Sequence, residues 1–202
     1  QKDLNETTLK LYQTQLNPHF LYNTLDTIKW EARIRQVPRI AVLAENLAII
    51  LRKSISSKPF IQLREELDTI ESYIKIQKIR FAGRFLYETE VPDMLEDCVI
   101  PKMILQPLVE NAITHGIGNK RGGGTVTIAT REEPDNWLIT VQDDGCGTDT
   151  IAADGLPPQQ EGGFIGLANV RQRVESIARG RLHFSSIKNK GATVTVVLPK
   201  ER

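Results

Sequence analysis

The sequence has little of what marks several large classes of protein. Its 202 residues include only two cysteines, Cys98 and Cys146, which are too few for a disulfide framework and lack the spacing of a zinc site. No apolar run approaches the roughly 20 residues that a membrane-spanning helix needs, and the polar start of the chain is unlike a signal peptide. These absences favour a reducing, cytosolic setting.

An excess of charge of one sign is also missing. The 26 basic residues are balanced by 25 acidic ones, so the formal net charge is +1 at pH 7. Nucleic-acid-binding domains usually carry a marked basic excess, and we therefore expect no nucleic-acid partner. The 40% of hydrophobic and 25% of charged residues are typical of soluble globular proteins, and the length allows two small domains.

Helical periodicity dominates residues 1–60. Apolar residues recur at helical spacing over residues 4–35, which predicts one long amphipathic helix with a kink at Pro18, just before His19. A second apolar stripe covers residues 40–54 after a turn. Two helices cannot cover their own apolar stripes, so we predict a homodimer in which two helical hairpins form a four-helix bundle.

The second predicted domain, residues 61–202, changes to strand periodicity after a helix at residues 63–81. Five segments are alternating or rich in β-branched residues and are predicted to be strands, namely 85–91, 125–131, 137–141, 181–187 and 193–198. Helices are expected at residues 101–115 and 165–178. The whole chain is therefore predicted to be an α+β protein, with an α/β sandwich as its second domain.

The predicted helix at 101–115 carries the pair Glu110-Asn111. Asn111, Thr114 and His115 share one face of that helix because they lie at i, i+3 and i+4. A neutral amide oxygen on a rigid helix is a suitable ligand for Mg²⁺. Taken alone, such a pair is most often part of a solvated helix surface, so its interpretation depends on the motifs further along the chain.

Glycines alternate with other residues in Asp143-Asp144-Gly145-Cys146-Gly147, directly after a predicted strand. They let the backbone turn tightly and approach a ligand closely. A carboxylate at the end of the strand, that of Asp143, can accept a hydrogen bond from an adenine amino group. An ordinary acidic turn would contain the same residues, and that alternative stays open at this point.

A polar stretch rich in glycine and proline spans residues 148–163 and is longer than most connections in compact domains. Connections of this length are usually lids or disordered segments. The stretch ends in the sequence GGFIGL, which includes Gly163, Gly166 and Leu167 and opens a helical pattern. Backbone N–H groups at such a helix start bind phosphates well.

The order of these motifs, completed by Gly191-Ala192-Thr193 before the last strand, resembles the GHKL-type ATPase domain shared by gyrase, heat-shock chaperones, mismatch-repair ATPases and histidine kinases. The resemblance implies that Asn111 holds Mg²⁺, that Asp143 contacts the adenine amino group, and that lid glycines cradle phosphates. The residues it assigns to ATP binding are Asn111, His115, Asp143, Gly145, Gly147, Gly163, Gly166, Leu167 and Thr193.

The segment QLNPHFLYN, residues 15–23, resembles the phosphoacceptor box of the LytS/YesM-type histidine kinases. The segments LREEL at 63–67 and QKIRF at 77–81 resemble the intervening helix of the same family. The resemblance implies that His19 takes the γ-phosphoryl group of ATP and passes it to an aspartate on the receiver domain of a response regulator. It also implies a cytoplasmic fragment, joined to the membrane through an N-terminal sensor region outside this chain.

Three residues depart from the pattern of many histidine kinases. Phe20 follows the phosphoacceptor where an acidic residue is common, Thr114 replaces a lysine, and Phe164 replaces a glycine. The group that accepts the imidazole proton is therefore unassigned, and Glu110 is only a candidate to orient a water or polarise the nucleophile. A second interpretation stays open, namely an ATP-binding interaction module with weak or lost kinase activity.

Overall fold

The computed structural model describes residues 18–118, 120, 122–151, 155–157 and 165–200. The chain divides into two compact units, Gln1–Ser57 and Lys58–Arg202. A boundary between residues 60 and 61, as expected from the sequence, would cut through the short strand β1 (Phe60–Gln62). This strand belongs to the second unit because all three of its residues pair with β3 (Val99–Pro101).

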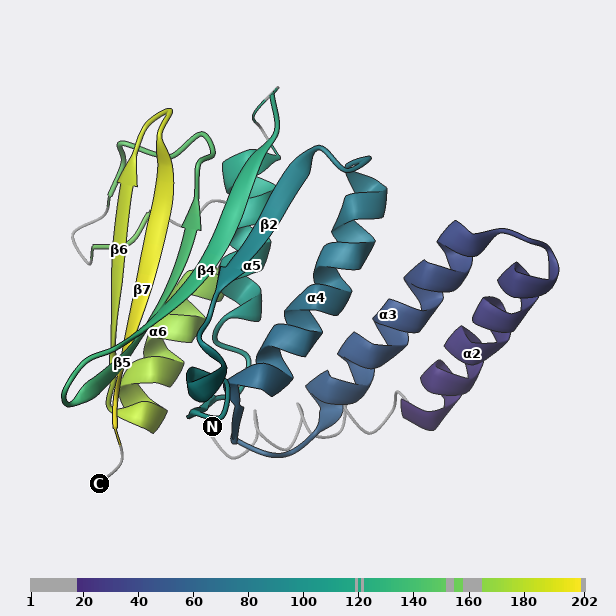
Figure 1. Cartoon of the computed structure of the whole chain (residues 1–202), viewed down its shortest axis with the longest axis horizontal. Helices are drawn as coiled ribbons and strands as arrows, with labels where there is room; N and C mark the ends of the chain where they lie inside the picture. The colour runs from purple at the N-terminus through teal and green to yellow at the C-terminus, as the bar shows by residue number, and fades with distance from the viewer. Residues whose placement is uncertain (1–17, 119, 121, 152–154, 158–164, 201–202) are drawn as a thin grey trace, which may run out of the picture. The chain divides into compact units, whose positions relative to one another are not determined.

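The first unit is a helical hairpin of α2 (Pro18–Ile34) and α3 (Pro38–Ile55), seen in purple and blue in Figure 1. Small side chains on the facing surfaces, Ala32, Ala41 and Ala44, are buried and allow the helices to pack closely. The hairpin and its turn were predicted from the sequence. The expected helix start near residue 4 and the kink before His19 lie outside the described residues.

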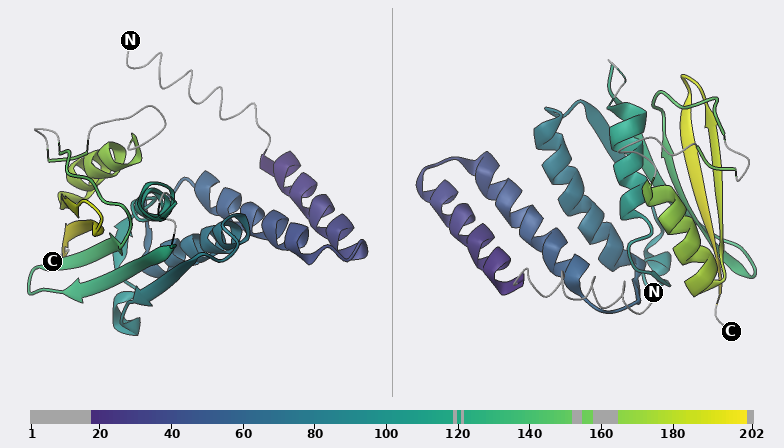
Figure 2. Two further views of the ribbon diagram at one scale, coloured as in Figure 1. Left: turned by 90° about the horizontal axis from the view of Figure 1, so that it is seen from above. Right: turned by 180° about the vertical axis from the view of Figure 1, so that it is seen from behind.

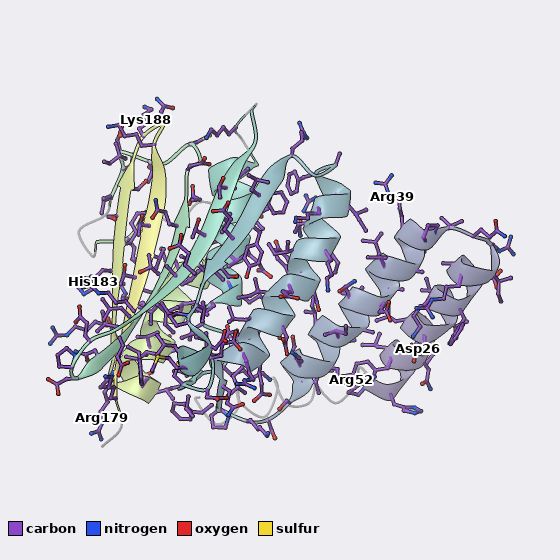
Figure 3. The ribbon with its side chains drawn as sticks, in the orientation of Figure 1. Asp26, Arg39, Arg52, Arg179, His183 and Lys188 are labelled. Atoms are coloured by element: carbon purple, nitrogen blue, oxygen red, sulfur yellow. The ribbon has the colours of Figure 1, made fainter. Side chains whose placement is uncertain are left out.

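Side chains near the open end of the hairpin join α2 to α3. The Arg52 guanidinium on α3 lies over the ring of Tyr22 on α2, at 5.4 Å from the ring centre. The Lys29 ammonium lies 2.6 Å from Asp26 and lowers the pKa of that carboxyl, and Arg52 lowers it further. Figure 3 labels Asp26 and Arg52 on their two helices.

The second unit contains a five-stranded sheet in the order β2-β4-β5-β7-β6. The strands are β2 (Phe85–Glu90), β4 (Gly124–Glu132), β5 (Asn136–Asp143), β6 (Arg181–Ile187) and β7 (Gly191–Pro199). The pair β2–β4 is parallel and the other neighbours are antiparallel. All five strands were predicted, with differences of two residues or fewer at each end.

Helices cover one face of this sheet, as the views in Figure 2 show. They are α4 (Leu63–Arg80), α5 (Gln106–Asn111), the π-helix η2 (Ala112–Ile117) and α6 (Ile165–Ala178). A short 3₁₀ turn, η1 (Asp93–Leu95), precedes β3. The architecture confirms the predicted α+β class and places helices against a single sheet.

Alternate residues of the central strands point into the core beneath these helices. Val126 and Ile128 on β4 are fully buried, and Ile139 on β5 and Val196 on β7 are nearly or fully so. Each such side chain contributes roughly 1.5 to 3 kcal/mol when it leaves water. The apolar residues at alternate positions in the sequence are therefore the residues on this inner face of the sheet.

The helix predicted at 101–115 was wrong in its start and in its type. Pro101 ends β3 instead, and Met103 then adopts a left-handed conformation with φ of 60°. The α-helix begins only at Gln106 and ends at Asn111, after which the chain continues as a π-helix. Three-residue strands such as β3 are too short to show a period in sequence, and only pairing with β1 defines this one.

Candidate functional site

A pocket opens between the helices and the inner face of β5, β6 and β7. Its lining combines apolar side chains from the helices and strands with a few polar groups. The lining residues are Leu108, Asn111, Ala112, His115, Gly116, Val141, Asp143, Gly147, Thr148, Leu167, Phe184, Ser186, Ala192 and Val194. This combination is typical of sites for small organic ligands, in which polar groups fix the orientation of the ligand.

The junction of α5 and η2 forms one wall of the pocket. At Ala112 the helix widens into a π-helix, a form found mostly as short insertions and frequently at functional sites. The pocket residues on this wall include Asn111, His115 and Gly116. The Nδ2 atom of Asn111 is buried without a hydrogen-bond partner in the described part of the chain, so this nitrogen has a hydrogen-bonding capacity that the protein leaves unused.

Asp143 is the buried carboxylate of the site. It ends β5, is 6% exposed, and accepts a hydrogen bond through Oδ1 from the backbone N–H of Gly145 at 2.8 Å. Burial raises the pKa of Asp143 to about 6, although the backbone N–H groups of Gly145 and Ala192 oppose this rise. The carboxyl group is therefore ionised at neutral pH.

The neighbouring carboxyl of Asp144 turns away from the pocket. It is exposed and accepts a hydrogen bond from the backbone N–H of Thr125 on β4 at 2.9 Å, and it lies 3.3 Å from the Lys120 ammonium. Of the two adjacent acids, only Asp143 lines the pocket. Through its hydrogen bond with Thr125, Asp144 instead holds the loop after β5 against β4.

Glycines let η2 approach the end of β5 without a side chain in between. A Cβ at Gly116 would lie 2.4 Å from Oδ1 of Asp143, and one at Gly145 would lie 2.2 Å from the carbonyl carbon of Gly116. The backbone N–H of Cys146 donates to the Gly116 carbonyl at 2.9 Å. The contact fixes Asp143 against the π-helix.

Ser186 organises the opposite wall. Its hydroxyl donates to the Gly191 carbonyl at 3.0 Å and accepts a hydrogen bond from the backbone N–H of Thr148 at 2.8 Å. The first residues after the glycine turn are thereby held against the ends of β6 and β7. Gly147 within this turn has φ of 55°, and a Cβ there would lie 2.1 Å from the Ile187 carbonyl oxygen.

Five of the residues assigned to ATP binding from the sequence line this one pocket, namely Asn111, His115, Asp143, Gly147 and Leu167. Two more lie beside it. Gly145 donates its backbone N–H to Asp143, and Gly166 lies close to Asn111, because a Cβ on it would be 3.6 Å from Nδ2.

Two other candidates lie away from the pocket lining. Thr193 alternates with Ala192 and Val194, which do line the pocket, so its side chain projects from the other face of β7. Glu110 accepts a hydrogen bond through Oε1 from the Gln106 side chain at 2.9 Å.

Two residues that depart from the family pattern, Thr114 and Phe164, were expected near the phosphates. Thr114 is exposed and forms a hydrogen bond with Tyr73 of α4. Phe164 and Gly163 lie outside the described residues, as does most of the predicted lid.

His19 lies in the first unit, exposed on the first turn of α2. Its Nδ1 atom is 3.3 Å from Nδ2 of Asn23, one turn further along the helix. Donor and acceptor roles in this pair depend on the tautomer of the ring and on the orientation of the amide. The contact orients the imidazole ring on the helix surface.

Several pocket residues were not recognised in the sequence, among them Gly116, Thr148, Phe184 and Ser186. Gly116 could have been suggested by its position beside His115. Phe184 and Ser186 alternate along a predicted strand, which shows that they share a face but not what that face covers. Only the pairing of β6 with β7, and of β7 with β5, brings them to Asp143.

In the described part of the chain, every helix is too short or too polar to span a lipid bilayer. Within the same ranges, no group of three or more His, Cys, Asp or Glu side chains is arranged to hold a metal ion.

Comparison with protein families gives two matches that cover most of the chain. The model of the histidine kinase family matches residues 7–85, and that of the histidine kinase-, DNA gyrase B- and HSP90-like ATPases matches residues 97–202. The second match contains the whole pocket and implies that this unit binds ATP.

Curated relatives include sensor histidine kinases of two bacteria. YesM of Bacillus subtilis is 36% identical over 97% of this chain and 34% of its own length, and YpdA of Escherichia coli is 35% identical over 98% and 35%. The sensor protein LytS of Bacillus subtilis is 31% identical over 100% of this chain and 35% of its own. The chain thus spans about a third of the length of these relatives.

Solved structures share the fold at low sequence identity. The histidine kinase domain of a blue-light-activated histidine kinase from Erythrobacter litoralis has a TM-score of 0.54 at 20% identity, covering 90% of this chain and 95% of that one. The catalytic domain of the histidine kinase ThkA has a TM-score of 0.53 at 16% identity, covering 71% and 99%.

Proposed function

The chain belongs to the LytS/YesM-type sensor histidine kinases, and we propose that it transfers the γ-phosphoryl group of ATP to His19. One observation carries the proposal: the ATPase-family unit holds Asn111 and Asp143 in a single apolar pocket, while the phosphoacceptor box presents an exposed histidine. In this proposal the second unit binds the nucleotide and the first unit accepts the phosphoryl group.

Asp143 is proposed to select adenine. Its carboxylate already accepts hydrogen bonds from the backbone N–H groups of Gly145 and Ala192, and it has acceptor sites left for the adenine amino group. The apolar walls given by Leu108, Val141 and Phe184 would cover the faces of the base. Because Asp143 itself is buried, an unmatched base would leave its carboxylate unpaired.

Asn111 is proposed to hold Mg²⁺ through its amide oxygen, and the glycines that open α6 are proposed to face the phosphates. The buried Nδ2 atom of Asn111, which lacks a hydrogen-bond partner among the described residues, supports this part, since an amide can turn its oxygen toward a cation. Gly166 beside it leaves the backbone at the start of α6 accessible. When bound, ATP supplies the phosphoryl group and Mg²⁺ neutralises part of its charge.

His19 is proposed to attack with Nε2. If Nδ1 carries the proton and the Asn23 amide turns its oxygen toward it, Nε2 keeps the lone pair. A new N–P bond then forms as the bond between the γ-phosphorus and its bridging oxygen breaks, and ADP leaves. The ring proton must pass to a base, for which Phe20 offers no acceptor and Glu110 lies outside the pocket lining.

The whole protein is proposed to act as a homodimeric, membrane-anchored sensor with its catalytic part in the cytoplasm. The phosphoryl group would pass from His19 to an aspartate on the receiver domain of a response regulator, as the relatives' names as sensor kinases suggest. A second candidate is a nucleotide-binding interaction module, which is favoured by Thr114 standing where many relatives carry a lysine.

Incubation with γ-labelled ATP and Mg²⁺ separates these functions. We expect an acid-labile, base-stable label on the parent chain and none on His19→Gln, because only the imidazole can form the N–P bond. ATP affinity, measured by calorimetry, should be nearly equal in both proteins, since His19 and the pocket lie in different units. Tight ATP binding without any label on the parent chain would support the interaction module instead.

A further inference from the structure

Two adjacent acidic residues at the start of α4 have different surroundings. Glu65 lies near the surface and accepts a hydrogen bond from the backbone N–H of Gln62 at 3.4 Å, which caps its own helix. Glu66 is only 2% exposed and points into the core of the second unit. A buried carboxylate is costly unless it is hydrogen-bonded, so the partners of Glu66 require explanation.

The partners of Glu66 are the first N–H groups of α5. Its Oε1 atom accepts hydrogen bonds from the backbone N–H of Leu105 at 2.7 Å and of Gln106 at 3.2 Å. The N-cap residue of α5, Leu105, provides no side-chain cap of its own. Glu66 therefore caps a helix that begins about forty residues later in the chain.

This cap matters because α5 is only six residues long and ends at Asn111. So short a helix has little stability by itself, and its direction depends on what holds its ends. At its C-terminal end it continues into η2, whose Gly116 contacts Asp143. At its N-terminal end, Glu66 is the side chain that satisfies the backbone donors.

The burial of the Glu66 carboxyl is not what packing alone would favour. The Oε2 atom of Glu66 is buried without a hydrogen-bond partner of normal geometry. Burial raises the pKa of Glu66 to about 7, with the backbone N–H groups at the start of α5 opposing the rise. An apolar side chain would fill the same space without this cost.

We propose that Glu66 is a positioning residue for the nucleotide site: its carboxyl group fixes the start of α5 so that Asn111 is presented to the phosphates and their metal ion. The proposal rests on the proposed ATP site. Glu66 is not among the residues that line the pocket. Its effect passes through the backbone of α5, and so it depends on a hydrogen-bond acceptor at this position rather than on charge.

Three variants of the whole chain test this. Glu66→Gln keeps an acceptor oxygen for Leu105 and Gln106, Glu66→Met keeps the length without an acceptor, and Glu65→Met removes the neighbouring carboxyl that caps α4. Calorimetry with ATP and Mg²⁺ should give similar affinities for the parent, Glu66→Gln and Glu65→Met. Glu66→Met should bind about tenfold more weakly or worse. Amide exchange of Leu105 and Gln106 should accelerate in Glu66→Met alone.

Thermal unfolding of each variant distinguishes positioning from general stability. If ATP affinity follows the unfolding temperature across all the proteins, or if Glu66→Met binds ATP like the parent, the inference is wrong. Should Glu66→Met fail to fold, Glu66→Asp shortens the side chain by one methylene and should weaken ATP binding in the same direction. A parent chain that binds no ATP would overturn the proposed function and this inference together.

Discussion

Asp143 shows how the surroundings of a residue distinguish it from an identical neighbour. The adjacent Asp144 has the same carboxyl group, yet it is exposed and bound to β4 and Lys120. Asp143 ends a strand in the core, where burial raises its pKa to about 6 and a glycine N–H occupies one of its oxygens. The order Asp-x-Gly-x-Gly after a strand is local information, so the sequence could single out Asp143 as the acid that ends the strand, while its contact with adenine stays a prediction.

The first prediction about a single residue concerns the selectivity of the pocket for adenine over guanine. An ionised Asp143 accepts a hydrogen bond from the amino group of adenine but would face the carbonyl oxygen of guanine, and an unpaired buried group costs about 1 to 3 kcal/mol. ATP should therefore bind roughly ten- to hundredfold more tightly than GTP. Asp143→Asn should weaken ATP binding and reduce this preference. Equal ATP affinity in the variant and the parent would contradict the role in adenine recognition.

The same residue should make ATP binding depend on pH. Below its pKa of about 6 Asp143 is protonated, and the resulting O–H is a donor that would face the donor amino group of adenine. Affinity should therefore be highest above pH 7 and fall by about tenfold toward pH 5. Asp143→Asn measured at each pH corrects for ionisation of the phosphates themselves. A parallel pH dependence in both proteins would show that Asp143 does not titrate in the site.

At the scale of elements, the site depends on the contact between η2 and the end of β5. This contact has no side chain on either side, since Gly116 and Gly145 meet through their backbones. Gly145→Ala would place a methyl group 2.2 Å from the Gly116 carbonyl carbon. Overpacking of this kind costs about 1 to 3 kcal/mol of folding free energy. Displacement of η2 should also weaken ATP binding.

Gly122→Ala is the matched control, because a Cβ there meets nothing within 4 Å. Denaturant unfolding and ATP titration of both variants measure the effect. We expect Gly122→Ala to resemble the parent in both. A Gly145→Ala variant of parental stability and affinity would mean that the two elements can separate without consequence for the site.

The helices and strands also show which parts of the fold could be predicted from sequence patterns. The five sheet strands and α6 were predicted because each carries a clear period over six or more residues. The strands β1 and β3 were missed because three residues show no period. The π-helix was missed because Ala112 to Ile117 has an ordinary helical composition, and its wider hydrogen-bond pattern leaves no mark in the sequence. The positions of β1, β3 and the π-helix depend on tertiary contacts, which the local sequence does not contain.

At the scale of the whole molecule, the hairpin of the first unit leaves large apolar side chains in water. On α3, Ile40 is 45% exposed and Leu47 is 48% exposed, and on α2, Trp30 is 57% exposed and Ile34 is 75% exposed. Ile40 and Leu47 are seven residues apart and so lie on one side of their helix. The predicted homodimer would cover these side chains in a four-helix bundle.

The last prediction tests this assembly. Replacing both Ile40 and Leu47 with glutamate places two charges where the bundle core would form, and burying unpaired charges is strongly unfavourable. Sedimentation should therefore show a dimer for the parent chain and a monomer for the double variant.

Leu86→Glu is the control, because Leu86 is 61% exposed on β2 of the other unit and its replacement should leave the dimer intact. The four-helix assembly is wrong if the parent chain sediments as a monomer at high micromolar concentration. ATP affinity should be unchanged in the monomeric variant, because every lining residue of the pocket belongs to the second unit of a single chain.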